Sequence, residues 1–333
     1  MKYLIRPNIA TAIKKQAGAA LVVALLIVFI VASLAVTVSS DFLVMFRRVE
    51  NQIHGQQAYA YLVGAEGLGR SAVLLDPSWS YDHLSEGILQ QPTAFANEIA
   101  QFTGTLSDIQ GRININTLQS ASKGTAGDYT VPQERFIRLL QTLNLATPLD
   151  VFTAEEIANA VFDWLDVDNN ERDPGGAEAY YYSEATPPGR AGNRAMQSVS
   201  ELRWVKGITP ELYQALLPHI TLWGNGKINI NTATEEVLRS LNKPKDLRPI
   251  SQMDVAILVE AQQPEEGGYD DISVFTQPPL ADLKIDSSEL AVNSEMFLLS
   301  TKVLMLDREY HLYSVIFRSN DSATVIARSQ QPL

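Results

Sequence analysis

The chain has 333 residues, a formal net charge of −12 and no cysteine. Its first 18 residues contain four Lys or Arg and no acidic residue, so the remainder has a net charge of −16. A body this acidic repels nucleic acid and anionic lipid surfaces, and it suits cations or basic partners. Without cysteine the chain has neither a disulfide nor a thiolate metal site. No two of its four histidines have the i, i+4 spacing of a zinc-binding helix.

Residues Ala19 to Val38 form an uncharged run of twenty residues, AALVVALLIVFIVASLAVTV. As a helix it would span about 30 Å, the thickness of the hydrocarbon core of a bilayer. The alternative is the apolar region of a cleaved secretory signal, but such regions are shorter and precede an Ala-x-Ala site. The run therefore predicts a membrane-spanning helix.

The charges that flank this run predict its orientation. Lys2, Arg6, Lys14 and Lys15 precede it, whereas the first charge after it is Asp41. Lys and Arg stay on the cytoplasmic side, so we expect a single-pass protein with a cytoplasmic N-terminus. In a Gram-negative cell the anchor would then lie in the inner membrane and the bulk of the chain in the periplasm.

The junction Lys14-Lys15-Gln16-Ala17-Gly18, followed by Ala19, resembles a type IV prepilin leader. The resemblance implies that a prepilin peptidase cuts after Gly18 and methylates the new N-terminus, Ala19. Most members of that family have Glu at the fifth mature position, where this chain has Val23. In the family this Glu is thought to pair with the terminal amine of a neighbouring subunit. A chain with Val23 lacks that pairing, so we expect it at a filament tip and not in the body.

The pattern beyond the membrane run predicts one long helix from about Ala20 to Leu75, with apolar residues at helical spacing and an end at Asp76-Pro77. Residues 95–117 then suggest two strands of a hairpin, in part because Ile113 and Ile115 alternate with polar neighbours. The Ser-, Gly- and Thr-rich segment 118–131 suggests a domain boundary.

Residues 132–262 are mainly helical by pattern, and residues 296–306, 309–318 and 323–328 predict a three-stranded antiparallel meander. The motif GRININT at 111–117 is echoed by GKININT at 226–232, and each is compatible with a strand that leads into a helix. Together these patterns predict an α+β fold in which an α/β domain contains a helical insertion.

The segment DWLDVDNNERDPGGAE, residues 163–178, suggests a calcium site. Hard oxygen ligands in a Gly- and Pro-containing loop suit Ca²⁺, although the spacing is not that of an EF-hand. The alternative is a solvated acidic loop with Asp helix caps. The expected role of the ion is structural, and the candidate ligands are Asp163, Asp166, Asp168, Asn170, Glu171 and Glu178.

Two other classes of function were weighed. KININTATEEVL, residues 227–238, resembles the start of helix-hairpin-helix modules of DNA-uptake proteins, but the Gly-containing hairpin of those modules does not follow it. The acidic charge further disfavours a membrane-tethered DNA receptor, so we expect no nucleic-acid partner. The sequence has no Gly-x-Ser-x-Gly, P-loop or His-Glu-x-x-His motif, and a periplasmic hydrolase that uses the acidic loop is the weaker alternative. We expect no enzymatic activity.

The chain as a whole resembles the K-type minor pseudopilins of the type II secretion system. The matching residues are Gly18 with Val23, the Asp-Trp-Leu-Asp-x-Asp run at 163–168, Pro174–Glu178 with the tyrosines that follow, 198–202 and 227–232. The resemblance implies a tip complex with I-type and J-type minor pseudopilins, together with contacts to other pseudopilins and the inner-membrane secretion platform. It is also compatible with calcium in the acidic loop.

The resemblance further implies the division of the chain. We expect a leader at 1–18, a long helix at 19–75 whose residues 19–38 span the membrane, and a pilin-like α/β domain built from 76–118 and 290–333. The segment between them, 119–289, would be a helical insertion of the helix-hairpin-helix or SAM-like kind.

Overall fold

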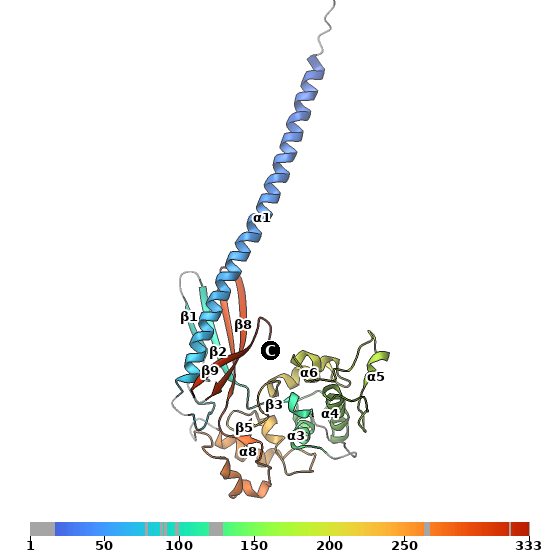
Figure 1. Ribbon diagram of the computed structural model, residues 1–333, viewed down its shortest axis with the longest axis vertical. Helices are drawn as coiled ribbons and strands as arrows, with labels where there is room; N and C mark the ends of the chain where they lie inside the picture. The colour runs from blue at the N-terminus through green and yellow to red at the C-terminus, as the bar shows by residue number, and fades with distance from the viewer. Residues whose placement is uncertain are drawn as a thin grey trace, which may run out of the picture. The chain divides into compact units, whose positions relative to one another are not determined.

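The structure is a computed structural model that describes residues 17–76, 79–86, 89, 92–96, 100–119, 129–262, 267–319 and 321–332. The chain divides into two units, one that ends at Gln57 and one that begins at Ala58. A single helix, α1 (Ala17–Leu74), contributes to both units (Figure 1). Of the expected leader, residues 1–18, the first 16 residues lie outside the described part of the chain.

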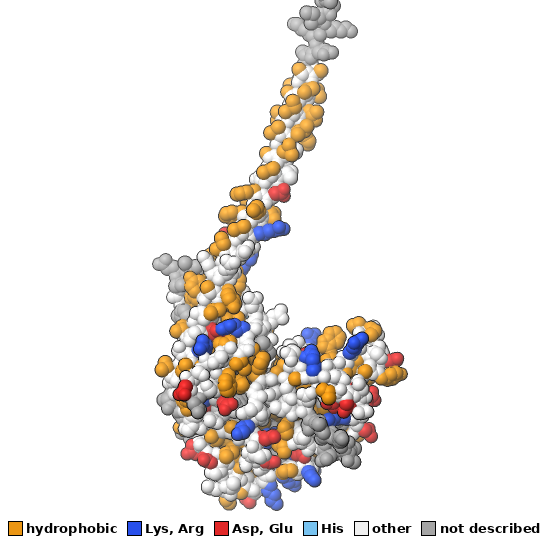
Figure 2. All heavy atoms as spheres, viewed as in Figure 1, with side chains coloured by type: hydrophobic (Ala, Val, Ile, Leu, Met, Phe, Trp, Pro, Cys, Tyr) orange, Lys and Arg blue, Asp and Glu red, His pale blue; other side chains and the backbone are white. Residues whose placement is uncertain are grey.

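In the first unit, α1 is apolar and exposed. It is long and apolar enough to cross a membrane, and none of its most hydrophobic window is buried. Figure 2 shows the hydrophobic side chains of this part around the helix. An all-round apolar surface without protein contacts is typical of a lipid-facing helix, and it agrees with the predicted span.

In the second unit, the last part of α1 packs on a five-stranded antiparallel sheet of order β1-β2-β7-β8-β9. Ala58 and Leu62 share one core cluster with Phe102 and Val303, whereas Val73 shares another with Leu106 and Phe297. The sheet consists of β1 (Thr93–Ala96), β2 (Ala100–Asp108), β7 (Met296–Met305), β8 (Arg308–Ser319) and β9 (Ser322–Ser329). The predicted helix and the predicted C-terminal meander are therefore confirmed.

A buried charge also fastens α1 to the sheet. Glu66, 2% exposed, receives two hydrogen bonds of 2.7 Å from the guanidinium of Arg328 and one from the hydroxyl of Ser314. These bonds hold the pKa of Glu66 below its usual range despite the opposing effect of burial. Gly69 lets the helix approach β7, because a Cβ at this position would overlap the side chain of Leu299.

Between β2 and β7 the chain forms a separate, mainly helical body with its own core (Figure 1). Two short parallel strand pairs, β3 with β4 and β5 with β6, brace this body. The elements are β3 (Ile113–Asn114), η1 (Ile115–Leu118), α3 (Val131–Thr142), α4 (Val151–Leu165), α5 (Ala179–Glu184), η2 (Val199–Trp204), α6 (Pro210–Leu216), η3 (Leu217–His219), β4 (Ile220–Thr221), β5 (Ile228–Asn229), α7 (Glu235–Arg239), α8 (Gln252–Ala261), η4 (Ile272–Thr276), η5 (Leu280–Leu283) and β6 (Leu290–Ala291).

The interpretation of residues 95–117 as one hairpin is wrong in its pairing. Residues 100–106 do form a strand, within β2, but β2 pairs with β1 and β7, whereas Ile113 and Ile115 lie in the core of the helical body and not in the large sheet. The chain makes one two-residue strand there and turns into η1, because the side chain of Asn114 accepts a hydrogen bond from the backbone nitrogen of Asn116. The core of the helical body thus begins at Ile113, within the segment that we expected in the pilin-like domain.

The two echoed motifs adopt the same local structure. Asn229 accepts a bond from the backbone nitrogen of Asn231, as Asn114 does from Asn116. In both motifs the second Asn donates to backbone carbonyls elsewhere in the body. The motif at 227–238 therefore uses the side chains of Asn229 and Asn231 for hydrogen bonds within the protein.

Candidate functional site

The acidic loop 166–178 connects α4 to α5, and it is fastened by Asp163 in the last turn of α4. The side chain of Asp163 is fully buried, and its Oδ2 accepts hydrogen bonds from the backbone nitrogens of Arg172 and Ala177 at 3.1 and 2.9 Å. Gly176 is required beside it, because a Cβ there would overlap this oxygen and the backbone of Arg172. Asp163 therefore folds the loop back over the end of the helix.

Three carboxylates of the loop converge. One oxygen each of Asp166, Asp168 and Glu178 lie within 4.8 Å of one another, the spacing of ligands around one cation. Glu178 is 2% exposed, and neither of its carboxylate oxygens has a hydrogen-bond partner in the structure. Oδ1 of Asp166 is likewise buried without one. Buried carboxylate oxygens without donors are costly, so this arrangement fits a bound cation.

The pKa values point the same way. Burial, with the neighbouring Asp163, raises the pKa of Glu178 to about 7. Burial is also the main cause that raises the pKa of Asp163 to about 7, and it raises that of Asp166. Ionised carboxylates in such a site repel one another, and a divalent cation would remove that repulsion.

One basic side chain accompanies the cluster. The guanidinium of Arg172 lies 3.5 Å from Asp163 and 3.6 Å from Asp166, and it also stacks over the ring of Phe162. Asp163, Asp166, Asp168 and Glu178 then face a single guanidinium, which leaves three uncompensated negative charges when all four are ionised. This excess is compatible with a divalent ion.

The six residues expected as ligands therefore have different positions. Asp166, Asp168 and Glu178 form the converging group, whereas Asp163 positions the loop. Asn170 and Glu171 are exposed, and Glu171 is not part of the group. The backbone nitrogen of Asn170 donates to Asp168. That these six residues bind a cation stays a prediction.

Sequence reasoning missed two residues that hold the loop. Asn193 donates from its side chain to the backbone carbonyl of Asp168 at 2.8 Å, and Arg172 pairs with two of the carboxylates. Arg172 lies inside the acidic motif and was recognisable as its one cation, but Asn193 is 25 residues from Asp168 and has no local signal.

A second acidic cluster, also missed, lies where the chain leaves α1. Arg318, at the end of β8, donates to Asp76 and Asp82 and to the carbonyl of Ser294. Burial raises the pKa of Asp82 to about 7 and that of Glu86 to about 8. The guanidinium is itself buried over the ring of Phe297 at 4.9 Å. Because Arg318 occupies this cluster, we read it as a structural ion network. Asp271 caps η4, because its side chain accepts a hydrogen bond from the backbone nitrogen of Ser273.

A helix with an apolar first half and a second half packed on an antiparallel sheet defines a pilin-like protein, here with a helical body inserted between two strands of the sheet. The family model for type II secretion system protein K matches residues 111–225. Type II secretion system protein K of Pectobacterium carotovorum is 30% identical over 325 residues, which cover 94% of this chain and 96% of that protein. Its counterpart in Aeromonas hydrophila is 28% identical, with 95% and 97% covered.

The chain belongs to the type II secretion system protein K family, the K-type minor pseudopilins. It also resembles the crystal structure of the GspK–GspI–GspJ complex from enterotoxigenic Escherichia coli. That likeness has a TM-score of 0.70 at 26% identity and covers 86% of this chain and 100% of the other. The resemblance read from the sequence is confirmed, as is the expected α+β fold.

Proposed function

We propose that this protein caps and starts the periplasmic pseudopilus, as part of a tip complex with the I-type and J-type minor pseudopilins of its own system. The proposal is supported by its likeness to a structure in which GspK is in complex with GspI and GspJ. Its relatives are secretion-system proteins, and we assign the chain a mechanical and not a catalytic role.

The observation that carries the proposal is where the helical body joins the sheet. The chain leaves β2 at Asp108 and returns at Met296, next to the core cluster that contains Val73 and not the one that contains Ala58. Val73 is further along α1 from the apolar run than Ala58. The body is thus attached at the end of the sheet that packs against the last residues of α1, and we propose that it obstructs a subunit that stacks on this one.

The anchor supplies the other half of the mechanism. The apolar part of α1 would hold the subunit in the inner membrane, with its N-terminus in the cytoplasm, until the secretion platform extracts it. A prepilin peptidase would cut between Gly18 and Ala19 and methylate Ala19. Because position 23 is Val, the mature helix would lack the carboxylate that could pair with the terminal amine of a neighbouring subunit. The second half of α1 would pack against the helices of the partners.

We further propose that the loop 166–178 binds one or more Ca²⁺ ions through Asp166, Asp168 and Glu178. Such an ion would offset the repulsion among the carboxylates and fix the connection between α4 and α5. The buried, unpartnered oxygens of Glu178 support this assignment. The bound ion would stiffen the helical body.

Co-expression with the I-type and J-type proteins tests the proposal. We expect a ternary complex that co-purifies through a tag on any one subunit. In cells that overproduce the major pseudopilin, gold-labelled antibody should mark this protein at one end of each pseudopilus. Labelling along the length of the filament, or a chain that co-purifies with neither partner, would contradict the proposal.

A further inference from the structure

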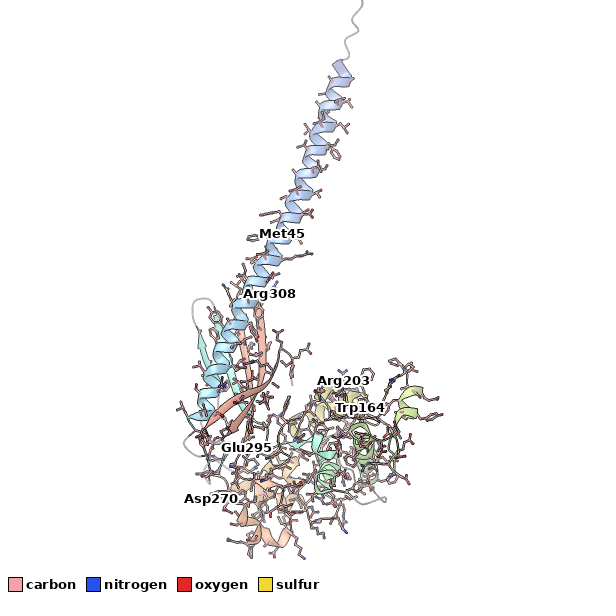
Figure 3. The ribbon with its side chains drawn as sticks, viewed as in Figure 1. Met45, Trp164, Arg203, Asp270, Glu295 and Arg308 are labelled. Atoms are coloured by element: carbon pink, nitrogen blue, oxygen red, sulfur yellow. The ribbon has the colours of Figure 1, made fainter. Side chains whose placement is uncertain are left out.

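The helical body has a hollow of about 690 Å³ beside the end of α4. Its wall contains three aromatic rings, in which Tyr182 meets Trp164 and Tyr181 edge to face, with ring centres 5.1 and 5.2 Å apart. Trp204, at the end of η2, also lines it and is 64% exposed. Trp164 is labelled in Figure 3.

Two of the aromatic residues that line the hollow are exposed to solvent. Tyr181 is 42% exposed, and neither it nor Trp204 belongs to the hydrophobic core of the body. Trp, Tyr and Arg are the residues that most often carry the binding energy of protein interfaces. The aromatic wall is therefore compatible with a docking surface.

The charge of the hollow is opposite to that of the chain. Arg190, Arg194 and Lys206 line it together with Glu201, which pairs with Arg194 at 3.3 Å. The hollow therefore has an excess of two positive charges, carried by Arg190 and Lys206, whereas the chain after residue 18 has a net charge of −16. Figure 2 shows Lys and Arg side chains next to hydrophobic ones over the part of the body that contains α5 and α6. Local cations and aromatic rings together select a ligand that carries negative charge.

The surface is held in place by its own contacts. The ammonium of Lys206 lies 5.1 Å from the ring of Tyr181 and donates to the carbonyl of Gly176. The backbone nitrogen of Gly189 donates to the carbonyl of Tyr182 at 2.8 Å, which folds the Pro187-Pro188 segment against α5. A preformed site loses less entropy when a ligand binds.

We propose that this hollow binds an extended acidic segment of another polypeptide. A hollow of this size holds a few side chains and not a folded surface. Charges are screened beyond about 8 Å at physiological ionic strength, so a short segment responds to the local cations. A nucleic acid is longer than the hollow and would meet the acidic surface around it. The rings offer stacking for the peptide planes and side chains, and the cations select Asp and Glu.

A display library of random dodecapeptides, panned on the full chain in lipid nanodiscs, tests this inference. We expect the enriched peptides to be rich in Asp and Glu. Labelled copies should bind in fluorescence anisotropy and weaken as salt increases. Trp204→Ala should weaken binding by about tenfold or more, as for a central aromatic residue of an interface. Arg190→Glu with Arg194→Glu should abolish binding of the acidic peptides.

Phe152→Ala and Arg248→Glu are the matched controls, because both side chains are exposed and neither lines the hollow. They should leave binding unchanged, and thermal melting should show that every variant is folded. Trp204 is exposed, so its variant keeps the test decisive if the double variant fails to fold. No enrichment, enrichment of basic or neutral peptides, or acidic peptides that bind Trp204→Ala as tightly as the unmodified chain would overturn the proposal. So would stronger binding of a neutral oligosaccharide such as maltohexaose.

Discussion

Replacing Glu178 by Gln should change stability in opposite directions with and without calcium. The carboxylate is buried, it has no hydrogen-bond donor in the structure, and its pKa is raised from 4.5 to about 7. In the absence of a cation, the ionised side chain is therefore a destabilising charge. With Ca²⁺ bound, the same charge is a ligand.

The raised pKa sets the size of the effect without calcium. One pKa unit corresponds to about 1.4 kcal/mol, so the rise of the Glu178 pKa from 4.5 to about 7 corresponds to at most about 3.5 kcal/mol well above pH 7. The amide has the same shape and no charge, and it can donate to the neighbouring carboxylates. In a chelator at about pH 8, Glu178→Gln should thus be more stable than the unmodified chain by about 1–3 kcal/mol.

The effect of calcium follows from mass action. At about 100 times the dissociation constant, an ion that binds only the folded state stabilises it by about 2.7 kcal/mol. We expect the unmodified chain to gain this stability, and Glu178→Gln to lose most of the gain. The two melting curves should therefore exchange their order when calcium is added.

Thermal melting of the full chain in detergent micelles, with EGTA or with CaCl₂, measures both effects. The matched control is Glu184→Gln, which removes the same charge from an exposed side chain at the end of α5, outside the acidic loop. It should melt like the unmodified chain under both conditions. A melting temperature that does not respond to calcium, or a control that loses the response as fully as Glu178→Gln, would refute the reasoning.

The remaining predictions concern the anchor, the ion network and one glycine. Val23→Glu should let the subunit enter the body of the filament, at a cost of about 2.5–3.5 kcal/mol on membrane insertion; gold labelling that stays confined to one end would contradict our account of the missing carboxylate. Arg318→Met should lower the free energy of unfolding by about 3–5 kcal/mol in urea titrations, since it leaves two buried carboxylates without their cation. Because the pKa of Asp82 is raised to about 7, the folded state holds this proton more tightly than the unfolded state. Stability should then fall by up to about 1.4 kcal/mol per pH unit as the pH rises from about 4 to 7, and Asp82→Asn should flatten that slope. Gly176→Ala should destabilise the helical body by about 1–3 kcal/mol, whereas Gly189→Ala, whose Cβ would meet nothing closer than 3.9 Å, should be tolerated.

The sequence alone predicted the helix and strands whose formation depends on residues close by in the chain. The long helix was expected from about Ala20 to Leu75 and runs from Ala17 to Leu74, because an uncharged run followed by apolar residues at helical spacing has no competing structure. The three C-terminal strands are joined by short turns, so their pairing was also readable. Ile113 and Ile115 were misread because a two-residue strand and a longer one begin with the same alternation. The partner that decides between them, Ile220, lies more than a hundred residues away.

The candidate sites also differ in whether neighbouring or distant residues form them. The proposed calcium loop could be predicted because its carboxylates lie within 16 consecutive residues. The sequence did not distinguish Asp163, which positions the loop, from Glu178, whose oxygens have no hydrogen-bond partner among the described residues. The aromatic hollow was not visible at all. It brings together the end of α4, the segment after α5 and the end of η2, and only the folded body makes Trp164 and Trp204 part of one surface.

The proposed capping role requires a rigid junction between the sheet and the helical body, and polar side chains form this junction. At the end of β2, Oδ2 of Asp108 accepts hydrogen bonds from Asn229, Thr232 and Ser294, at 3.2, 2.6 and 2.6 Å. Asn229 and Thr232 belong to the second echoed motif, and Ser294 lies two residues before β7, so one carboxylate ties two segments of the chain to the end of β2. Directional bonds resist bending and twisting in a way that an apolar contact does not, because a small rotation weakens each of them. The second echoed motif thus provides two of the three donors, Asn229 and Thr232, which assigns this motif a structural role at the junction of the sheet and the helical body.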